Sequence, residues 1–150
     1  MYSFRKQRSR GHEGERILDA LFGKFFEIRR ASAAQQRQGI DRVMMGKVHK
    51  QTLHVEYKTD YTAVTSGNAF IELHCAGSPG WALTSQAQYI AYLVPDQHVY
   101  VVNVAKLRTQ LTEWERRFEQ RTITNRGYMA TGLLVPLTCL AEISETVYAV

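Results

Sequence analysis

Three charged residues in the first part of the chain could do chemistry together. Asp41 lies in the middle of an apolar stretch, and Glu56 and Lys58 follow it closely. Alternate side chains of a β-strand point to the same face, so Glu56 and Lys58 would lie on one face, about 7 Å apart at ~3.3 Å per residue. Val55 and Tyr57, which alternate with them, would form the opposite face. The segment is therefore predicted to have one apolar face and one reactive face.

An acidic residue inside an apolar strand needs a partner, because burying an unpaired carboxylate costs roughly several kcal/mol. If the two strands pair, Asp41 and Glu56 come side by side, and a proton or a divalent cation must relieve their repulsion. Oxygen ligands select Mg²⁺, with Mn²⁺ as a possible substitute. Such a cation binds phosphate oxygens, and the Lys58 ammonium can position and activate a water molecule. These are the parts that phosphodiester hydrolysis requires.

A simpler interpretation of the same residues is a cross-strand salt bridge on a solvated sheet face, worth a few tenths to about 1 kcal/mol. The protein would then be a non-catalytic nucleic-acid-binding module. Three other titratable residues are nearby, namely His49, His54 and Glu72. They are predicted to be surface or supporting groups rather than ligands. Trp81 and Trp114 are predicted to be packing residues.

The elements that would position these residues follow from the spacing of apolar residues. Between Glu13 and Arg29 they recur at three- and four-residue steps, which predicts an amphipathic helix. Strands are predicted over 40–45, 53–58, 69–74 and 99–104, and further helices over 86–94 and 105–121. Pro136 interrupts the last apolar run, which predicts an edge strand or an irregular segment.

This order of elements predicts a mixed α/β fold (α+β, mixed sheet) with one central sheet. The 150 residues predict a single domain over 1–150. No secretion signal and no run of about 18 apolar residues is visible, and Cys75 and Cys139 belong to no metal or disulfide pattern. These observations predict a cytoplasmic protein without a membrane segment.

The charge of the chain favours a polyanionic partner. Nineteen Lys and Arg against 14 Asp and Glu give a net charge of +5. Residues 1–10 form a basic arm without acidic residues. A second group of polar residues lies around Asp41, with Arg37 and Gln38 before it and Arg42 after it. The residues predicted to contact nucleic acid are Arg5, Lys6, Arg8, Arg10, Arg37, Gln38 and Arg42.

Asp41 and the Glu56-x-Lys58 pattern, with a helical glutamate upstream, resemble the PD-(D/E)XK nuclease superfamily, although no proline precedes Asp41. The resemblance covers residues 11–58. It implies a restriction-endonuclease-like αβββαβ core with flanking helices, metal ligation by Asp41 and Glu56, and a catalytic role for Lys58. It also implies that a glutamate of the first helix assists at the metal or its water. The segment Gly11-His-Glu-Gly-Glu15 resembles the start of that helix in resolvase-like members, which favours Glu15 over Glu13. At 100° per residue the two glutamates flank the apolar stripe on opposite sides, so geometry alone lets either reach the sheet.

A second resemblance involves Gln88 and Tyr92. They resemble the Gln-xxx-Tyr element of the exonuclease-type branch of the same superfamily, where both lie on one helix face near the site. The resemblance therefore implies a supporting role for this pair, provided that residues 86–94 form a helix.

The expected function is a Mg²⁺-dependent endonuclease that cleaves double-stranded DNA at specific sites, as restriction or homing enzymes do. The catalytic residues would be Glu15, Asp41, Glu56 and Lys58, with Asp41, Glu56 and Glu15 at the metal. A junction-resolvase-like nuclease, an RNA-processing nuclease and the non-catalytic module remain alternatives. Because one small chain carries one site, cutting both strands predicts a homodimer or a higher homo-oligomer.

Overall fold

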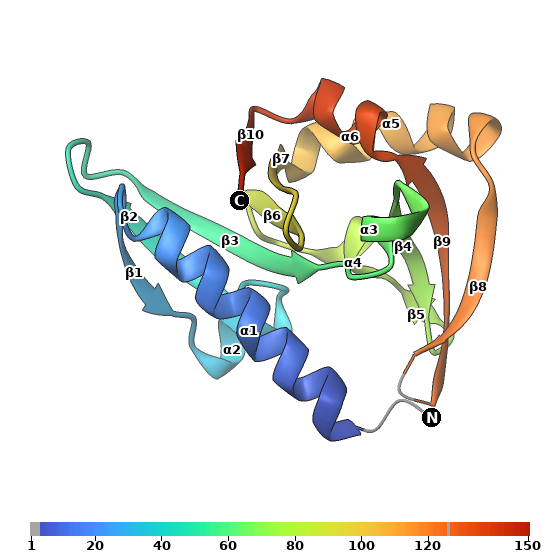
Figure 1. Ribbon diagram of the computed structural model, residues 1–150, viewed down its shortest axis with the longest axis horizontal. Helices are drawn as coiled ribbons and strands as arrows, with labels where there is room; N and C mark the ends of the chain where they lie inside the picture. Colours follow the sequence, from blue (N-terminus) through green and yellow to red (C-terminus); the bar gives the residue numbers. More distant parts are fainter. Residues whose placement is uncertain (1–3, 126) are drawn as a thin grey trace.

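The computed structural model describes residues 4–125 and 127–150, with side chains described for 9–124 and 127–150. The chain forms two β-sheets with flanking helices (Figure 1). The larger sheet has the order β1-β2-β3-β6-β7-β10, formed by β1 (Phe26–Arg30), β2 (Arg42–Gly46), β3 (Thr52–Thr59), β6 (Tyr89–Val94), β7 (His98–Asn103) and β10 (Thr146–Ala149). The smaller sheet has the order β5-β4-β9-β8, formed by β5 (Ser78–Pro79), β4 (Asn68–Cys75), β9 (Tyr128–Pro136) and β8 (Gln120–Asn125).

The larger sheet is mixed. Its strands β1, β2 and β3 form an antiparallel meander, and β3 then pairs with β6 in parallel. The segment 60–88, which joins β3 to β6, contains β4 and β5 of the smaller sheet. The helices are α1 (Phe4–Phe22), α2 (Ala33–Arg37), α3 (Ala63–Ser66), α4 (Trp81–Thr84), α5 (Val104–Arg117) and α6 (Leu137–Ile143). None of those in the described residues is long and apolar enough to span a membrane.

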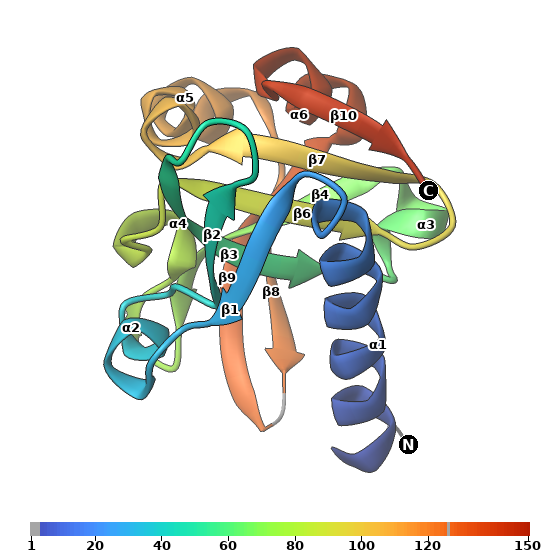
Figure 2. The ribbon, with the colours of Figure 1, turned by 90° about the vertical axis from the view of Figure 1, so that its left-hand side faces the viewer.

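Helix α1 covers one face of the larger sheet (Figures 1 and 2). Its buried residues Leu18 and Phe22 pack against Val55 and Tyr57 of β3, which form the apolar face predicted from the alternation. The helix ends at Phe22, and a Cβ atom at Gly23 would lie only 2.8 Å from the Asp19 carbonyl oxygen. The chain therefore turns here and returns as β1.

The largest group of buried apolar residues lies between the smaller sheet, the strands β6 and β7, and the helices α5 and α6. Ile71 of β4 and Leu133 of β9 are fully buried in it, together with Trp114 of α5. This core joins the two sheets, so the smaller sheet is fixed relative to the strands that carry the predicted reactive residues.

Several predicted elements are confirmed. The protein has a mixed α/β fold with a mixed sheet and flanking helices. The strands over 40–45, 53–58, 69–74 and 99–104 correspond to β2, β3, β4 and β7. The helix over 105–121 corresponds to α5, which ends at Arg117, so its last four predicted residues are not helical and the final two belong to β8.

The prediction of one central sheet is wrong, because β4 pairs with β9 rather than with β3. The expected irregular or edge segment near Pro136 is also wrong. It forms β9, an inner strand between β4 and β8, and Pro136 ends that strand where α6 begins. Such pairings depend on partners far apart in the sequence, which local patterns do not reveal.

The helix predicted over 86–94 is the strand β6. Ile90, Ala91, Leu93 and Val94 are all almost completely buried, so both faces of this strand are covered. A short strand buried on both faces has the same apolar run as a buried helix, and periodicity alone does not separate them. The first predicted helix is likewise too long at its end, because residues from Phe26 onward form β1.

Candidate functional site

The predicted site forms where β2 begins beside the middle of β3. The backbone N–H of Asp41 donates to the carbonyl oxygen of Val55 at 2.9 Å, which continues the β2–β3 pairing by one residue. The carboxylate oxygen Oδ2 of Asp41 accepts the backbone N–H of Tyr57 at 2.7 Å. This bond holds the Asp41 carboxylate against β3, next to Glu56.

Glu56 is a buried acid, with 5% of its surface exposed. Its oxygen Oε1 lies 3.0 Å from the ammonium nitrogen Nζ of Lys58, as expected for two residues on one strand face. Its second oxygen, Oε2, is buried and has no hydrogen-bond partner among the described residues. A buried carboxylate oxygen without a donor is costly, and a bound cation would satisfy it.

The pKa of Asp41 is raised above its ordinary value. Burial is the largest cause, opposed by the hydrogen bond from the Tyr57 N–H, and the charges of Glu56 and Glu15 raise the pKa further while Lys58 lowers it. The structure thus brings Glu15, Glu56 and Lys58 within electrostatic reach of Asp41. Carboxylates gathered in this way favour a shared proton or a cation.

Glu15 reaches this region from α1. Its carboxylate lies 3.7 Å from the guanidinium of Arg42 and 3.5 Å from the imidazole of His12. The charge of Glu13 acts on Tyr61 instead. Burial is the largest cause of the raised pKa of Tyr61, and the charge of Glu13 raises it further. Among the described residues, no three His, Cys, Asp or Glu side chains lie close enough to hold a metal together. The candidate site therefore centres on the carboxylates of Asp41 and Glu56, and Glu15 contributes to it through the effect of its charge on Asp41.

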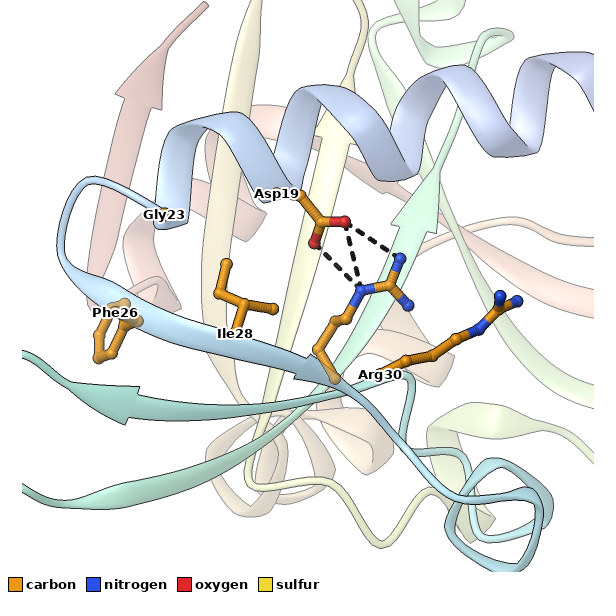
Figure 3. Close-up of a pocket in the computed structure, with 6 residues that line it drawn as sticks. Asp19, Gly23, Phe26, Ile28 and Arg30 are labelled. Atoms are coloured by element: carbon orange, nitrogen blue, oxygen red, sulfur yellow. Dashed lines mark hydrogen bonds and ion pairs between the residues drawn. The ribbon is translucent and has the colours of Figure 1, made fainter.

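Arg42 is not placed to contact nucleic acid, which corrects the sequence prediction. Only 8% of it is exposed. Its Nε and Nη2 donate to the Asp19 carboxylate at 3.1 and 3.2 Å, and Nη1 donates to the Asp41 carbonyl oxygen at 3.1 Å. Figure 3 shows the Asp19 carboxylate of α1 accepting hydrogen bonds from the guanidinium, at a pocket beside β1. Arg42 thus joins α1 to the start of β2.

Tyr57 completes this network. Its hydroxyl donates to Asp19 Oδ1 at 2.8 Å, and the Arg42 guanidinium lies 5.1 Å from the centre of its ring. Because the Tyr57 N–H also binds Asp41, the contacts from Asp41 through Tyr57, Asp19 and Arg42 close into a ring. Sequence reasoning missed Asp19, whose one available signal is its position four residues after Glu15 on the same helix face.

Gln88 and Tyr92 do not have the predicted supporting role, because they lie on or next to a strand rather than on a helix face. The hydroxyl of Tyr92 is buried, donates to Asp60, and accepts the backbone N–H of Phe70 at 3.1 Å. The side-chain oxygen of Gln88 accepts the backbone N–H of His54 at 2.9 Å. Both residues support the sheet.

The remaining predicted contacts to nucleic acid lie on α1 and α2. Residues Arg5, Lys6 and Arg8 belong to the first turns of α1, and their side chains lie outside the described part of the structure. The Arg10 guanidinium lies 4.8 Å from the centre of the Tyr61 ring. Arg37 and Gln38 are exposed at the end of α2, just before Asp41.

Trp81 packs partly buried against the core, which confirms its predicted packing role, and it is also a neighbour of the site. The ammonium nitrogen of Lys58 lies 5.4 Å from the centre of the Trp81 ring. The Gly-Ser-Pro-Gly turn before Trp81 was visible in the sequence, but its position beside β3 depends on the crossover between the sheets.

The geometry therefore assembles two carboxylates, an ammonium and a supporting arginine where β2 begins beside the middle of β3, on inner strands of the larger sheet. Oxygen ligands of this kind suit Mg²⁺ or Mn²⁺. Comparisons of the chain with protein-family models, with curated proteins and with solved structures found no match.

Proposed function

We propose that this protein is a Mg²⁺-dependent endonuclease that hydrolyses phosphodiester bonds in double-stranded DNA, with Mn²⁺ as a possible substitute. The observation that carries the proposal is the buried Glu56 carboxylate, whose Oε2 lacks a donor among the described residues, beside an Asp41 whose pKa is raised. A divalent cation held by both carboxylates would satisfy the free oxygen and relieve the repulsion.

The arrangement of elements supports membership of the PD-(D/E)XK superfamily. Helix α1 precedes the meander β1–β3, and a crossover leads to the parallel strand β6. Asp41 stands at the start of the second strand of this series, and Glu56 and Lys58 stand on the third. The αβββαβ core implied by the resemblance has this order, although the crossover here carries short helices and the smaller sheet.

Each residue of the site has a chemical task in this proposal. A bound Mg²⁺ ion supplies a Lewis acid for a phosphate oxygen and lowers the pKa of bound water. Asp41 and Glu56 hold the ion, and Lys58 positions the attacking water and offsets charge that develops on the phosphate. Glu15 orients that water or serves as a further ligand. Arg42 keeps the strand of Asp41 fixed to the helix of Glu15.

The basic residues of the first helices would hold the DNA backbone near these groups. Each phosphate contact releases counterions and makes binding depend on salt. The residues proposed for these contacts are Arg5, Lys6, Arg8, Arg10, Arg37 and Gln38. Since cleavage of both strands needs two sites, we propose that a homodimer or a higher homo-oligomer acts on the duplex.

Cleavage of supercoiled plasmid tests this proposal. We expect the wild-type protein to nick or linearise the plasmid with Mg²⁺, and Lys58→Ala to lower the rate roughly 10²–10³-fold, the cost of losing one charge-stabilising donor. A four-way DNA junction and a single-stranded RNA, incubated in parallel, distinguish a resolvase-like or RNA-processing enzyme. Arg116→Ala, at a residue on α5 that pairs with Glu113, is the control and should cleave at the wild-type rate. Cleavage by Lys58→Ala at the wild-type rate would contradict the proposed role of this lysine.

Calcium binding tests the cation site independently of the substrate. At about ten times its Kd, Ca²⁺ should raise the free energy of unfolding by ~1.4 kcal/mol, because it binds the folded protein only. Glu56→Gln should abolish this gain, whereas the exposed Glu142→Gln should keep it. Thermal denaturation with and without Ca²⁺ measures the difference. If the wild-type protein binds DNA but is not stabilised by Ca²⁺ or Mg²⁺ and cuts none of the three substrates, the non-catalytic module is the correct interpretation.

A further inference from the structure

We propose that the Trp81 ring is a second binding place for the Lys58 ammonium, which moves from Glu56 to Trp81 when a divalent cation binds the carboxylates. The inference rests on the proposed cation site and adds a positioning residue to it. The Lys58 ammonium has two partners, the Glu56 carboxylate and the Trp81 ring, and ion binding shifts it from the first toward the second.

The two partners of Lys58 lie close to it. Its nitrogen Nζ is 3.0 Å from Glu56 Oε1 and 5.4 Å from the centre of the Trp81 ring. An ammonium within about 6 Å of an indole centre is attracted by the negative face of the ring. The Lys58 side chain is 32% exposed, whereas that of Glu56 is only 7% exposed, so the lysine is the partner with room to move.

The first turn of α4, which carries Trp81, is held from two sides. Its backbone N–H donates to the Glu72 carboxylate at 3.4 Å, and a Cβ atom at Gly80 would lie 2.7 Å from both the Cγ and the carbonyl oxygen of Glu72. The turn before Trp81 therefore packs directly on β4. From the other side, Arg108 of α5 donates to the Ala82 carbonyl oxygen at 3.0 Å. These contacts fix the backbone that carries the ring, and the Trp81 side chain itself packs partly buried against the core.

Charge explains why ion binding shifts the lysine. In the structure the ammonium neutralises Glu56 through Oε1, while Oε2 has no donor among the described residues. A divalent cation on the same carboxylate places two positive charges close together, which disfavours the ammonium there. The ring of Trp81 attracts the ammonium without occupying a carboxylate oxygen. Lys58 thus frees Glu56 for the cation and stays charged near the site.

Tryptophan fluorescence tests the exchange without DNA or catalysis. The sequence contains two tryptophans, and Trp114 lies buried in the core between the sheets. Titration with Ca²⁺ or Mg²⁺ should shift the emission of Trp81, and the shift should saturate at the concentration at which calorimetry detects ion binding. We expect Trp81→Phe and Lys58→Met to lose the shift while still binding the ion. Leu83→Ala, at an exposed residue of the same helix, is the matched control and should keep it.

Cleavage by a double-variant series gives a second readout. Trp81→Leu should lower the cleavage rate roughly two- to fivefold, the size of one cation–π contact, and Trp81→Phe should restore part of it. In a Lys58→Met background, Trp81→Leu should have no further effect, which a merely structural role of Trp81 does not predict. If the leucine variant fails to fold, the fluorescence of the wild-type and Lys58→Met proteins decides alone.

The outcomes separate this inference from the proposed function. Ion binding in calorimetry without a change in Trp81 emission, or an equal change in Lys58→Met, overturns the exchange and leaves the cation site intact. Absence of ion binding overturns both proposals. A shift that requires both Lys58 and Trp81 supports the exchange.

Discussion

Asp41→Asn is expected to lower DNA cleavage on the order of 10³-fold or more, because it removes one of the two carboxylates that we propose hold the cation. The fold should not suffer, because the amide oxygen of asparagine can still accept the Tyr57 N–H that Asp41 accepts at 2.7 Å. Plasmid cleavage and urea denaturation of the same preparations measure the two effects. A variant that loses stability together with activity would contradict this separation.

The stability of this variant relative to wild type should depend on pH. Burial, above all, and the charges of Glu56 and Glu15 raise the pKa of Asp41 above its ordinary value of 3.8 in the folded protein. The folded state therefore binds a proton more tightly than the unfolded chain. This contribution to stability is fully present below pH 3.8 and is lost as the pH rises through the folded pKa.

Asp41→Asn should consequently gain stability relative to wild type as the pH rises through that pKa, and should be at least as stable at pH 7. Denaturation curves from pH 4 to 8 in the absence of divalent ions measure the difference. The exposed Glu142→Gln is the control and should show no such trend. A wild-type advantage that grows with pH would contradict the raised pKa.

Arg42→Met is expected to destabilise the protein by about 2–3 kcal/mol. Removing one partner of a buried ion pair typically costs ~3–5 kcal/mol. The cost is smaller here because the Asp19 side chain is 38% exposed, so water can solvate it once the guanidinium is gone. The variant should also cleave DNA more slowly, since the donor to the Asp41 carbonyl oxygen and the partner of Glu15 are lost together.

A double-mutant cycle with Asp19→Asn, followed by urea denaturation, tests the network. Because the two side chains are in contact, their effects should not add, and a coupling of roughly 0.5–3 kcal/mol is expected. Arg116→Met is the control, since its pair with Glu113 is exposed and should contribute at most about 1 kcal/mol. Additive effects of Arg42 and Asp19 would show that their contact does not stabilise the fold.

The proximity of Asp41, Glu56 and Lys58 could be predicted because it depends on local rules. Strand alternation places Glu56 and Lys58 on one face, and a short connection makes β2 and β3 antiparallel neighbours. The choice of Glu15 over Glu13 rests on the resemblance rather than on a local rule, and in the structure the charge of Glu15 is among the causes of the raised pKa of Asp41.

The surroundings of these residues could not be predicted in the same way. Arg42 looked like a surface cation because the sequence does not show Asp19 and Tyr57 converging on it from two other elements. Trp81 comes beside Lys58 only through the packing of α4 on β4. The predicted packing role of Trp81 is nevertheless confirmed, because it packs partly buried against the largest core. Both missed contacts join residues far apart in the chain, for which neither periodicity nor composition carries a signal.

The parallel pairing of β3 with β6 has a consequence for how the chain tolerates change in length. Backbone hydrogen bonds hold both ends of the connecting segment, residues 60–88, to the paired strands. The Asp60 N–H donates to the Leu93 carbonyl oxygen and the Gln88 N–H donates to the His54 carbonyl oxygen, each at 2.9 Å. The entropy of closing a flexible segment grows only with the logarithm of its length, about 0.6 kcal/mol for each doubling. Extra residues at the exposed turn between β4 and β5 would thus leave the carboxylates undisturbed, and natural or engineered insertions could add new recognition loops there.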